Sequence, residues 1–175
     1  MKVTFIRHTA VDVPRGSCYG QSDVPLRDTF EEEAKIVRER LKGRSFDKVY
    51  TSPLSRCVRL AEYCGYADAE RDRRIMELNF GDWEMQLFEE IKDPNLQAWY
   101  DDYLHVRATN GESFHDQLKR VSDFLDELRC KPYGNVAVFA HGGVLICAEL
   151  YSGRIKEEEA FDALLPYGSE LTVEL

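Results

Sequence analysis

The chain has 175 residues, of which 43% are hydrophobic and 31% charged, a composition typical of one ordinary globular domain. Its 23 basic and 32 acidic residues give a net charge of −9, which argues against nucleic-acid or anionic-membrane binding because both need a basic surface. We see neither an apolar run of roughly 20 residues, as a bilayer span requires, nor a secretory signal, so we expect a cytoplasmic protein with no nucleic-acid and no membrane partner.

The N-terminal part of the chain predicts a strand followed by a loop and a helix. Residues 3–6 are apolar and mostly β-branched, which is typical of a buried strand. After a long polar stretch with turn residues, Asp28 and Glu31 have the spacing of a capping box at a helix start. Apolar residues then keep helical spacing until Gly43 ends the predicted helix.

A second strand and helix follow directly. Val49 and Tyr50 form the end of a predicted strand. Ser52 is a suitable N-cap and Pro53 suits the first position of a helix, which Gly65 is expected to end. The order strand, helix, strand, helix favours parallel neighbouring strands.

The middle of the chain is less regular. Residues from about 70 to 110 predict only short helices, one around 84–91 and one around 95–106. An amphipathic helix then covers residues 114–128. We expect the irregular segment to be an insertion near the functional site.

The last quarter returns to alternating elements. Residues 136–140 predict a third buried strand, 144–151 a helix and 170–174 a late strand. The predicted fold is an α/β, three-layer α/β/α sandwich with a mostly parallel open sheet, formed by residues 1–175 as a single domain.

Polar groups follow each of the three predicted parallel strands. Arg7 and His8 follow the first strand, Arg56 lies just inside the helix after the second, and His141 and Gly142 follow the third. Ligands of open α/β sheets bind at the carboxyl ends of the strands. Arginine forks and the N-termini of helices both suit a phosphate group, so the sequence predicts an anion site at this edge.

Each of these residues also has a simpler interpretation. Arg7 alone could be a surface charge, and His8 and His141 could be structural histidines at strand ends. Arg56 lies opposite the apolar face of its helix, which by itself favours a solvated side chain. Four cationic or potentially cationic groups at one edge would repel one another without an anion, and this favours the phosphate interpretation.

Five ordered motifs resemble the histidine phosphatase superfamily, also called phosphoglycerate mutase-like. They cover residues 7 to 143 and are Arg7-His8-Thr9, Thr51-Ser52-Pro53-Leu54-Ser55-Arg56, Glu77-Leu78-Asn79-Phe80-Gly81-Asp82-Trp83-Glu84, Gly111-Glu112-Ser113 and His141-Gly142-Gly143. The family more often has glycine where Thr9 stands here, a departure found within one subgroup. The resemblance implies an enzyme, a phosphoric monoester hydrolase with the fold predicted above.

The resemblance also implies roles for individual residues. His8 is expected to attack phosphorus and form a phosphohistidine, with its other ring nitrogen bound to a backbone carbonyl that fixes the tautomer. Arg7, Arg56 and His141 are expected to hold the phosphoryl oxygens. Glu77 matches the general acid of the family, although a solvated acid in a charged segment is its alternative.

The loop over residues 16–26 is similar to that of alpha-ribazole phosphatases, which act in cobalamin biosynthesis, and the Thr9 variant fits the same subgroup. Arg15, Tyr19 and Gln21 are therefore candidate substrate-binding residues, with a purely structural loop as the alternative. Gly142, which follows the third predicted strand, is a further candidate for binding the phosphate. Glu84 is expected to be structural and to orient a group of the site.

The resemblance leaves other functions open. A broad-specificity phosphatase of sugars or other small molecules, a phosphoglycerate mutase and a non-catalytic phosphate-binding module are the alternatives. Mutases usually carry longer insertions around the pocket, for which 175 residues leave little material. A dinucleotide-binding module is disfavoured because no Gly-x-Gly-x-x-Gly follows the first strand.

The expected partner is a small-molecule phosphate monoester, with no cofactor, no metal and either a monomer or a homodimer. His105 and His115 lie in charge-rich stretches and are expected at the surface. The odd number of cysteines and their wide spacing predict reduced thiols; these are Cys18, Cys57, Cys64, Cys130 and Cys147.

Overall fold

One five-stranded sheet runs through the computed structural model, which describes residues 1–175. Four of its strands pair in parallel, and the last strand joins the edge antiparallel to the first. The predicted α/β fold with a mostly parallel sheet is therefore confirmed. In spatial order the strands are β3 (Glu70–Arg71), β2 (Lys48–Thr51), β4 (Asn135–Ala140), β1 (Lys2–Arg7) and β5 (Glu170–Glu174).

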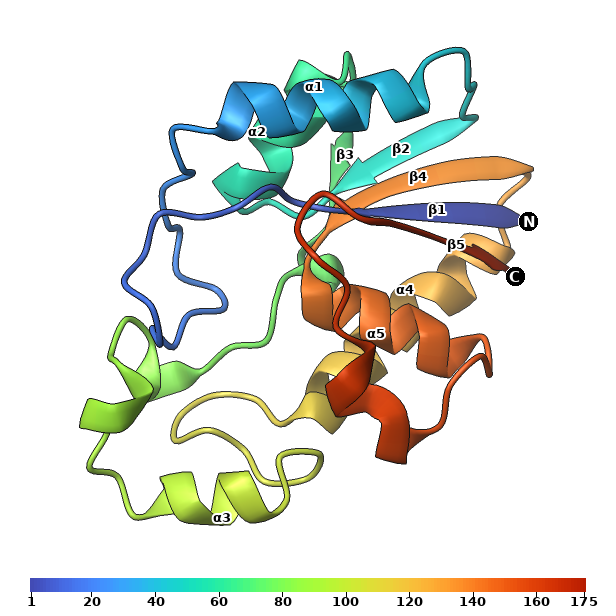
Figure 1. Cartoon of the computed structure of the whole chain (residues 1–175). Coiled ribbons are helices and arrows are strands. Elements are labelled where there is room, and N and C mark those ends of the chain that lie inside the picture. The colour runs from blue at the N-terminus through green and yellow to red at the C-terminus, as the bar shows by residue number, and fades with distance from the viewer.

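Helices cover both faces of the sheet and make three layers (Figure 1). The helices α1 (Phe30–Leu41) and α2 (Ser55–Tyr63) cover one face, and α4 (Phe114–Arg129) and α5 (Gly142–Tyr151) cover the other. Side chains of a strand point alternately to the two faces. Along β4, for example, Val138 packs with α4 and α5, whereas Phe139 packs with α1 and α2.

The irregular part of the chain lies beyond one end of the sheet (Figure 1). It contains α3 (Asn95–Asp101) and the short 3₁₀ turns η1 (Arg73–Ile75), η2 (Gly81–Trp83) and η3 (Phe88–Glu90). A further 3₁₀ segment, η4 (Glu157–Ala163), connects α5 to β5. Trp83 and Leu96 belong to a small separate apolar cluster that supports this region.

Two helices begin differently from the prediction. Helix α2 begins at Ser55 instead of Pro53, because the backbone of Leu54 is extended. The hydroxyl of Ser52, the predicted N-cap, lies 2.7 Å from Nε2 of His141, which follows β4. Helix α1 follows Thr29 and has no side-chain cap, so the capping box expected from Asp28 is absent. A capping box is found instead at α4, where the side chains of Ser113 and Asp116 each accept a hydrogen bond from the other residue's backbone amide.

Three other elements differ from the prediction. Only the turn η3 forms within the predicted helix 84–91, and α3 stops at Asp101 instead of continuing to residue 106. Strand β3 has two charged, exposed residues and therefore lacks the apolar pattern of a strand. None of the helices combines the length and apolar character that crossing a bilayer requires.

Candidate active site

Strands β1, β2 and β4 end at the same edge of the sheet. Arg7 of β1 pairs with Ala140 of β4, and the next amide, of His8, donates to the Ala140 carbonyl over 3.1 Å. The amide of Ser52, directly after β2, donates to the Phe139 carbonyl of β4 over 2.9 Å. The register therefore brings together the polar residues that follow these strands, as expected for parallel neighbours.

His8 is almost fully buried, with 2% of its surface exposed. Its Nδ1 donates to the carbonyl of Thr9 over 2.7 Å, so in the neutral ring Nε2 carries the free lone pair. Burial is the largest cause that holds the pKa of His8 well below 6.5, and the charges of Arg56 and Arg7 add to it, while the bond to Thr9 acts in the opposite direction. The ring is therefore neutral near pH 7.

His141 lies beside His8 at the start of α5 and is fully buried. The two imidazole rings meet edge to face with their centroids 5.2 Å apart. Nε2 of His141 lies 2.7 Å from Oγ of Ser52, and Sγ of Cys57 lies 3.4 Å from the same nitrogen. Burial above all, and next the charge of Arg56, hold the pKa of His141 well below 6.5.

Arg7 is held from two sides. One of its guanidinium nitrogens donates to the carbonyl of Leu165, and the group lies 4.2 Å from the ring centroid of Tyr167. Its Nε is buried and has no hydrogen-bond partner. A Cβ at Gly142 would come within 3.2 Å of the same guanidinium, so the glycine leaves room for Arg7 at the start of α5.

Arg56 is completely buried, which corrects the solvated position that its helical face alone suggested. Its guanidinium donates to the carbonyls of Ser22, over 2.9 Å, and of Gly20, and it lies 5.5 Å from the ring centroid of Tyr19. Its Nε, like that of Arg7, is buried without a partner. Two guanidinium groups that are bound only to neutral carbonyls leave an excess of positive charge for an anion to compensate.

Glu77 faces these cations from the segment that follows η1. Its Oε1 accepts from the amide of Leu78 over 3.0 Å and from Nε2 of Gln117 over 2.8 Å. Its Oε2 accepts from the amide of Gly143 over 3.2 Å. Behind it, Arg120 donates to the Glu77 carbonyl over 2.9 Å. The carboxyl group is therefore fixed in position next to the start of α5.

Glu84 organises the loop that holds Arg56. Its carboxylate accepts from the amides of Gly20 and Gln21, over 3.0 and 2.9 Å, and from that of Phe80 over 3.2 Å. It also accepts from the hydroxyl of Ser22 over 2.7 Å. The carbonyls that bind Arg56 belong to Gly20 and Ser22 of this same loop, so Glu84 positions Arg56 by holding the loop. Sequence reasoning expected an orienting role for Glu84 without identifying what it orients.

A cavity of about 510 Å³ opens above His8. Its polar end is formed by Arg7, His8 and Glu77, and most of the remaining lining is apolar. We call five aromatic residues of this lining the aromatic wall. They are Phe80 directly before η2, Trp99 of α3, Tyr103 two residues after α3, Phe114 at the start of α4 and Phe161 of η4. The aromatic wall was missed by sequence reasoning.

The other predicted site residues lie around this cavity in different ways. Tyr19 lines it, and its hydroxyl lies 2.8 Å from that of Tyr167. Gln21 instead turns to the backbone and donates from Nε2 to the Glu77 carbonyl over 3.1 Å. Arg56 and His141 are fully buried next to His8 and are not part of the exposed lining.

The remaining sequence expectations concern residues outside the cavity. All five cysteines are free thiols, as predicted. His105 is exposed and His115 is half-buried.

Comparisons with known proteins identify relatives of the whole fold. The chain matches the model of the histidine phosphatase superfamily (branch 1) over residues 3–172. It is 34% identical over 154 residues to the adenosylcobalamin/alpha-ribazole phosphatase of Escherichia coli K12, with 83% of this chain and 75% of that protein covered. It is also 27% identical over 145 residues to phosphoserine phosphatase 1 of Hydrogenobacter thermophilus, with 79% of this chain and 69% of that protein covered.

Among solved structures, the fold is similar to that of the alpha-ribazole phosphatase from Shigella flexneri. The TM-score is 0.89 at 27% sequence identity, and the superposition covers 100% of this chain and 91% of that one.

Proposed function

The chain belongs to branch 1 of the histidine phosphatase superfamily, and from this membership we propose that it hydrolyses alpha-ribazole 5′-phosphate through a phosphohistidine formed on His8. That the chain is a phosphatase of this superfamily is established by the family match. The substrate and the roles of single residues are our proposal. The observation that carries the mechanism is the neutral, buried ring of His8, with its free Nε2 beside two guanidinium groups that lack an anionic partner.

In the first step, the lone pair of His8 Nε2 attacks phosphorus and the bond from phosphorus to the ester oxygen breaks. Arg7, Arg56 and the neutral His141 donate hydrogen bonds to the phosphoryl oxygens, whose negative charge is spread in the transition state. Both guanidinium groups are already held by carbonyls, which positions them before the phosphate binds.

Proton transfer falls to Glu77 in this proposal. In its protonated form the carboxyl group gives its proton to the leaving oxygen, which departs as an alcohol. In the second step the carboxylate takes a proton from water, the water oxygen bonds to phosphorus, and the bond from phosphorus to Nε2 breaks. The products are inorganic phosphate and free His8, so the cycle is balanced.

The aromatic wall supports a substrate with a large planar group. Alpha-ribazole carries an aromatic base on its ribose, and such a base packs well against aromatic side chains. A phosphoserine or phosphoglycerate leaving group has a carboxylate instead, and Arg7 is the only Lys or Arg in the cavity lining. Similarity to two proteins named alpha-ribazole phosphatases supports the same substrate.

The covalent step is tested by rapid quenching with a labelled phosphomonoester. We expect label on His8 that is lost in acid and retained in base. The variant His8→Ala should carry no label and lose at least about 10⁴-fold in kcat, because the nucleophile is removed. Its melting temperature is measured in parallel to show that it is folded. A fully active wild type without label would contradict the covalent route.

The substrate is tested separately with a panel of phosphomonoesters. We expect the highest kcat/KM for alpha-ribazole 5′-phosphate, compared with phosphoserine, 3-phosphoglycerate and simple sugar phosphates. Activity should also persist in a strong chelator, because the cationic site supplies the electrostatic stabilisation. The highest kcat/KM on phosphoserine, 3-phosphoglycerate or a simple sugar phosphate would contradict the proposed substrate but leave the phosphohistidine route intact.

A further inference from the structure

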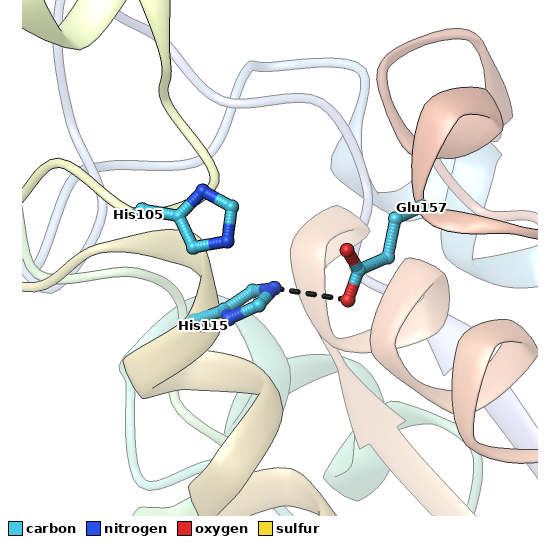
Figure 2. A group of neighbouring side chains, drawn as sticks. All are labelled: His105, His115 and Glu157. Carbon is cyan, nitrogen blue, oxygen red and sulfur yellow. Dashed lines mark hydrogen bonds and ion pairs between the residues drawn. The ribbon is translucent and has the colours of Figure 1, made fainter.

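A second group of metal-ligating side chains lies outside the catalytic residues. His105, His115 and Glu157 each direct one ligand atom into a common space, and these atoms all lie within 4.8 Å of one another (Figure 2). Nε2 of His115 is already 3.0 Å from Oε1 of Glu157. The two imidazole rings meet edge to face with their centroids 4.4 Å apart.

The chemistry of the three groups is that of a zinc-class site. Two imidazoles and one carboxylate are a common ligand set for Zn²⁺, with water as the fourth ligand. Tetrahedral coordination with bonds of about 2.0–2.1 Å separates ligand atoms by roughly 3.3 Å. The 3.0 Å between His115 and Glu157 is close to this separation, and the ligand atom of the exposed His105 lies within 4.8 Å of both.

A carboxylate behind His105 adds the second feature of such sites. Nδ1 of His105 lies 2.9 and 3.0 Å from the two carboxylate oxygens of Asp102. This pairing occupies one ring nitrogen and leaves Nε2 to bind a metal, as carboxylate–histidine pairs do in known metal centres. A simple surface ion pair between His115 and Glu157 explains neither the edge-to-face ring of His105 nor the carboxylate of Asp102 behind it.

We propose that His105, His115 and Glu157 bind one zinc-class divalent cation, which fastens η4 to the start of α4 at the edge of the cavity. The three ligands come from three segments that also build the aromatic wall. His105 is two residues after Tyr103, His115 directly follows Phe114, and Glu157 begins the segment that contains Phe161. A bound cation therefore links the chain segments around the leaving-group side and takes no part in phosphoryl transfer.

Binding is tested by titrating Zn²⁺ against a chromophoric chelator. All proteins carry Cys130→Ser, because that thiol is exposed and competes for zinc. We expect one zinc equivalent in this parent protein, at least tenfold weaker binding in His105→Ala, His115→Ala and Glu157→Gln, and loss of the site when both histidines are replaced. Glu158→Gln is the matched control, because this exposed neighbour lies outside the cluster, and it should bind zinc like the parent.

Fastening is tested by hydrogen exchange of the amides of residues 157–163 with and without zinc. Exchange should slow with zinc in the parent and in Glu158→Gln, and should not change in the double histidine variant. Equal zinc stoichiometry and affinity in the parent and the double variant would overturn the site. Zinc binding at the three residues without slower exchange of the amides of residues 157–163 would show that the cation does not fasten η4. Neither readout depends on phosphatase activity, so failure here leaves the proposed function untouched.

Discussion

The two ends of the cavity differ in how the chain builds them. At the polar end, Arg7 and His8, with His141 buried beside them, lie at or directly after paired parallel strands, and their positions follow from the register of the sheet. The aromatic wall is assembled mainly from turns, a short helix and a 3₁₀ segment beyond the sheet, with Phe114 added from the start of α4. A rigid sheet edge suits phosphate chemistry, which tolerates little displacement, whereas variable segments suit the choice of leaving group.

After the loss of the nucleophile, the largest effect at the polar end of the cavity is expected from a change of Glu77. Glu77→Gln should lower kcat by about 10²–10³-fold for substrates that leave as an alcohol, because the proton donor is removed. For a nitrophenyl ester the loss should be far smaller, since a nitrophenolate leaves without a proton. Steady-state kinetics on both substrates measure the difference, and equal losses on the two would contradict the role of general acid.

The next effect is expected at Glu84, which acts on the polar end through the loop of Arg56. In Glu84→Gln the new amide group meets backbone amides that need an acceptor, so the loop shifts and Arg56 loses its position. We expect kcat/KM to fall by about 10-fold to 10²-fold, because a small displacement of a binding group is costly.

A matched variant distinguishes this effect from a general loss of negative charge. Glu89 is exposed, and Glu89→Gln should keep full activity. A crystal structure of Glu84→Gln with a phosphate analogue should show a displaced Arg56. Unchanged kinetics in Glu84→Gln would show that the loop does not need this carboxylate.

At the opposite end, Phe161 tests the contribution of the aromatic wall. Its side chain is 76% exposed, so Phe161→Ala should fold normally while losing contact with an aromatic base. We expect KM for alpha-ribazole 5′-phosphate to rise by about 3-fold to 10-fold, at nearly constant kcat. KM for a small phosphomonoester should stay the same.

The control for Phe161 is another exposed apolar residue, on the far helix α1. Ile36 is 55% exposed, and Ile36→Ala should leave KM unchanged both for alpha-ribazole 5′-phosphate and for a small phosphomonoester. Equal changes in KM for large and small esters in Phe161→Ala would remove the aromatic wall from substrate selection.

The last prediction concerns how the stability of the protein depends on pH through the buried pair His8 and His141. His8 and His141 have a pKa well below 6.5 in the folded protein, mainly because of burial, whereas in the unfolded chain it is near 6.5. Below pH 6.5 the unfolded state therefore binds more protons, and the free energy of unfolding falls as the pH falls. We expect a loss of at most about 1 kcal/mol per histidine between pH 6.5 and 5.5.

Urea unfolding at several pH values measures this dependence. The variant His8→Gln should have a weaker pH dependence than the wild type over the same interval, because one of the two titrating groups is gone. The same slope in both proteins would contradict the assignment to His8.

The amount that could be predicted differs between elements for physical reasons. β1 and β4 are runs of apolar residues, and α4 has an amphipathic pattern. Each of these patterns indicates a buried surface over many consecutive residues, so the three elements could be predicted. The two charged residues of β3 carry no such pattern and form a strand only because β2 offers a free edge. Segments such as residues 102–106 depend on long-range contacts, which local sequence does not encode.

The alternation of strands and helices, the five ordered motifs and the cationic residues after the strands could all be predicted from the amino-acid sequence. These are local features, because hydrophobic periodicity and short motifs are set by neighbouring residues. The folded structure was needed to show that Arg56 is buried, that Glu84 holds the loop of Arg56, and that five aromatic residues from distant segments form one wall. Those features arise from packing between segments far apart in the chain, where burial and hydrogen-bond partners depend on the complete fold.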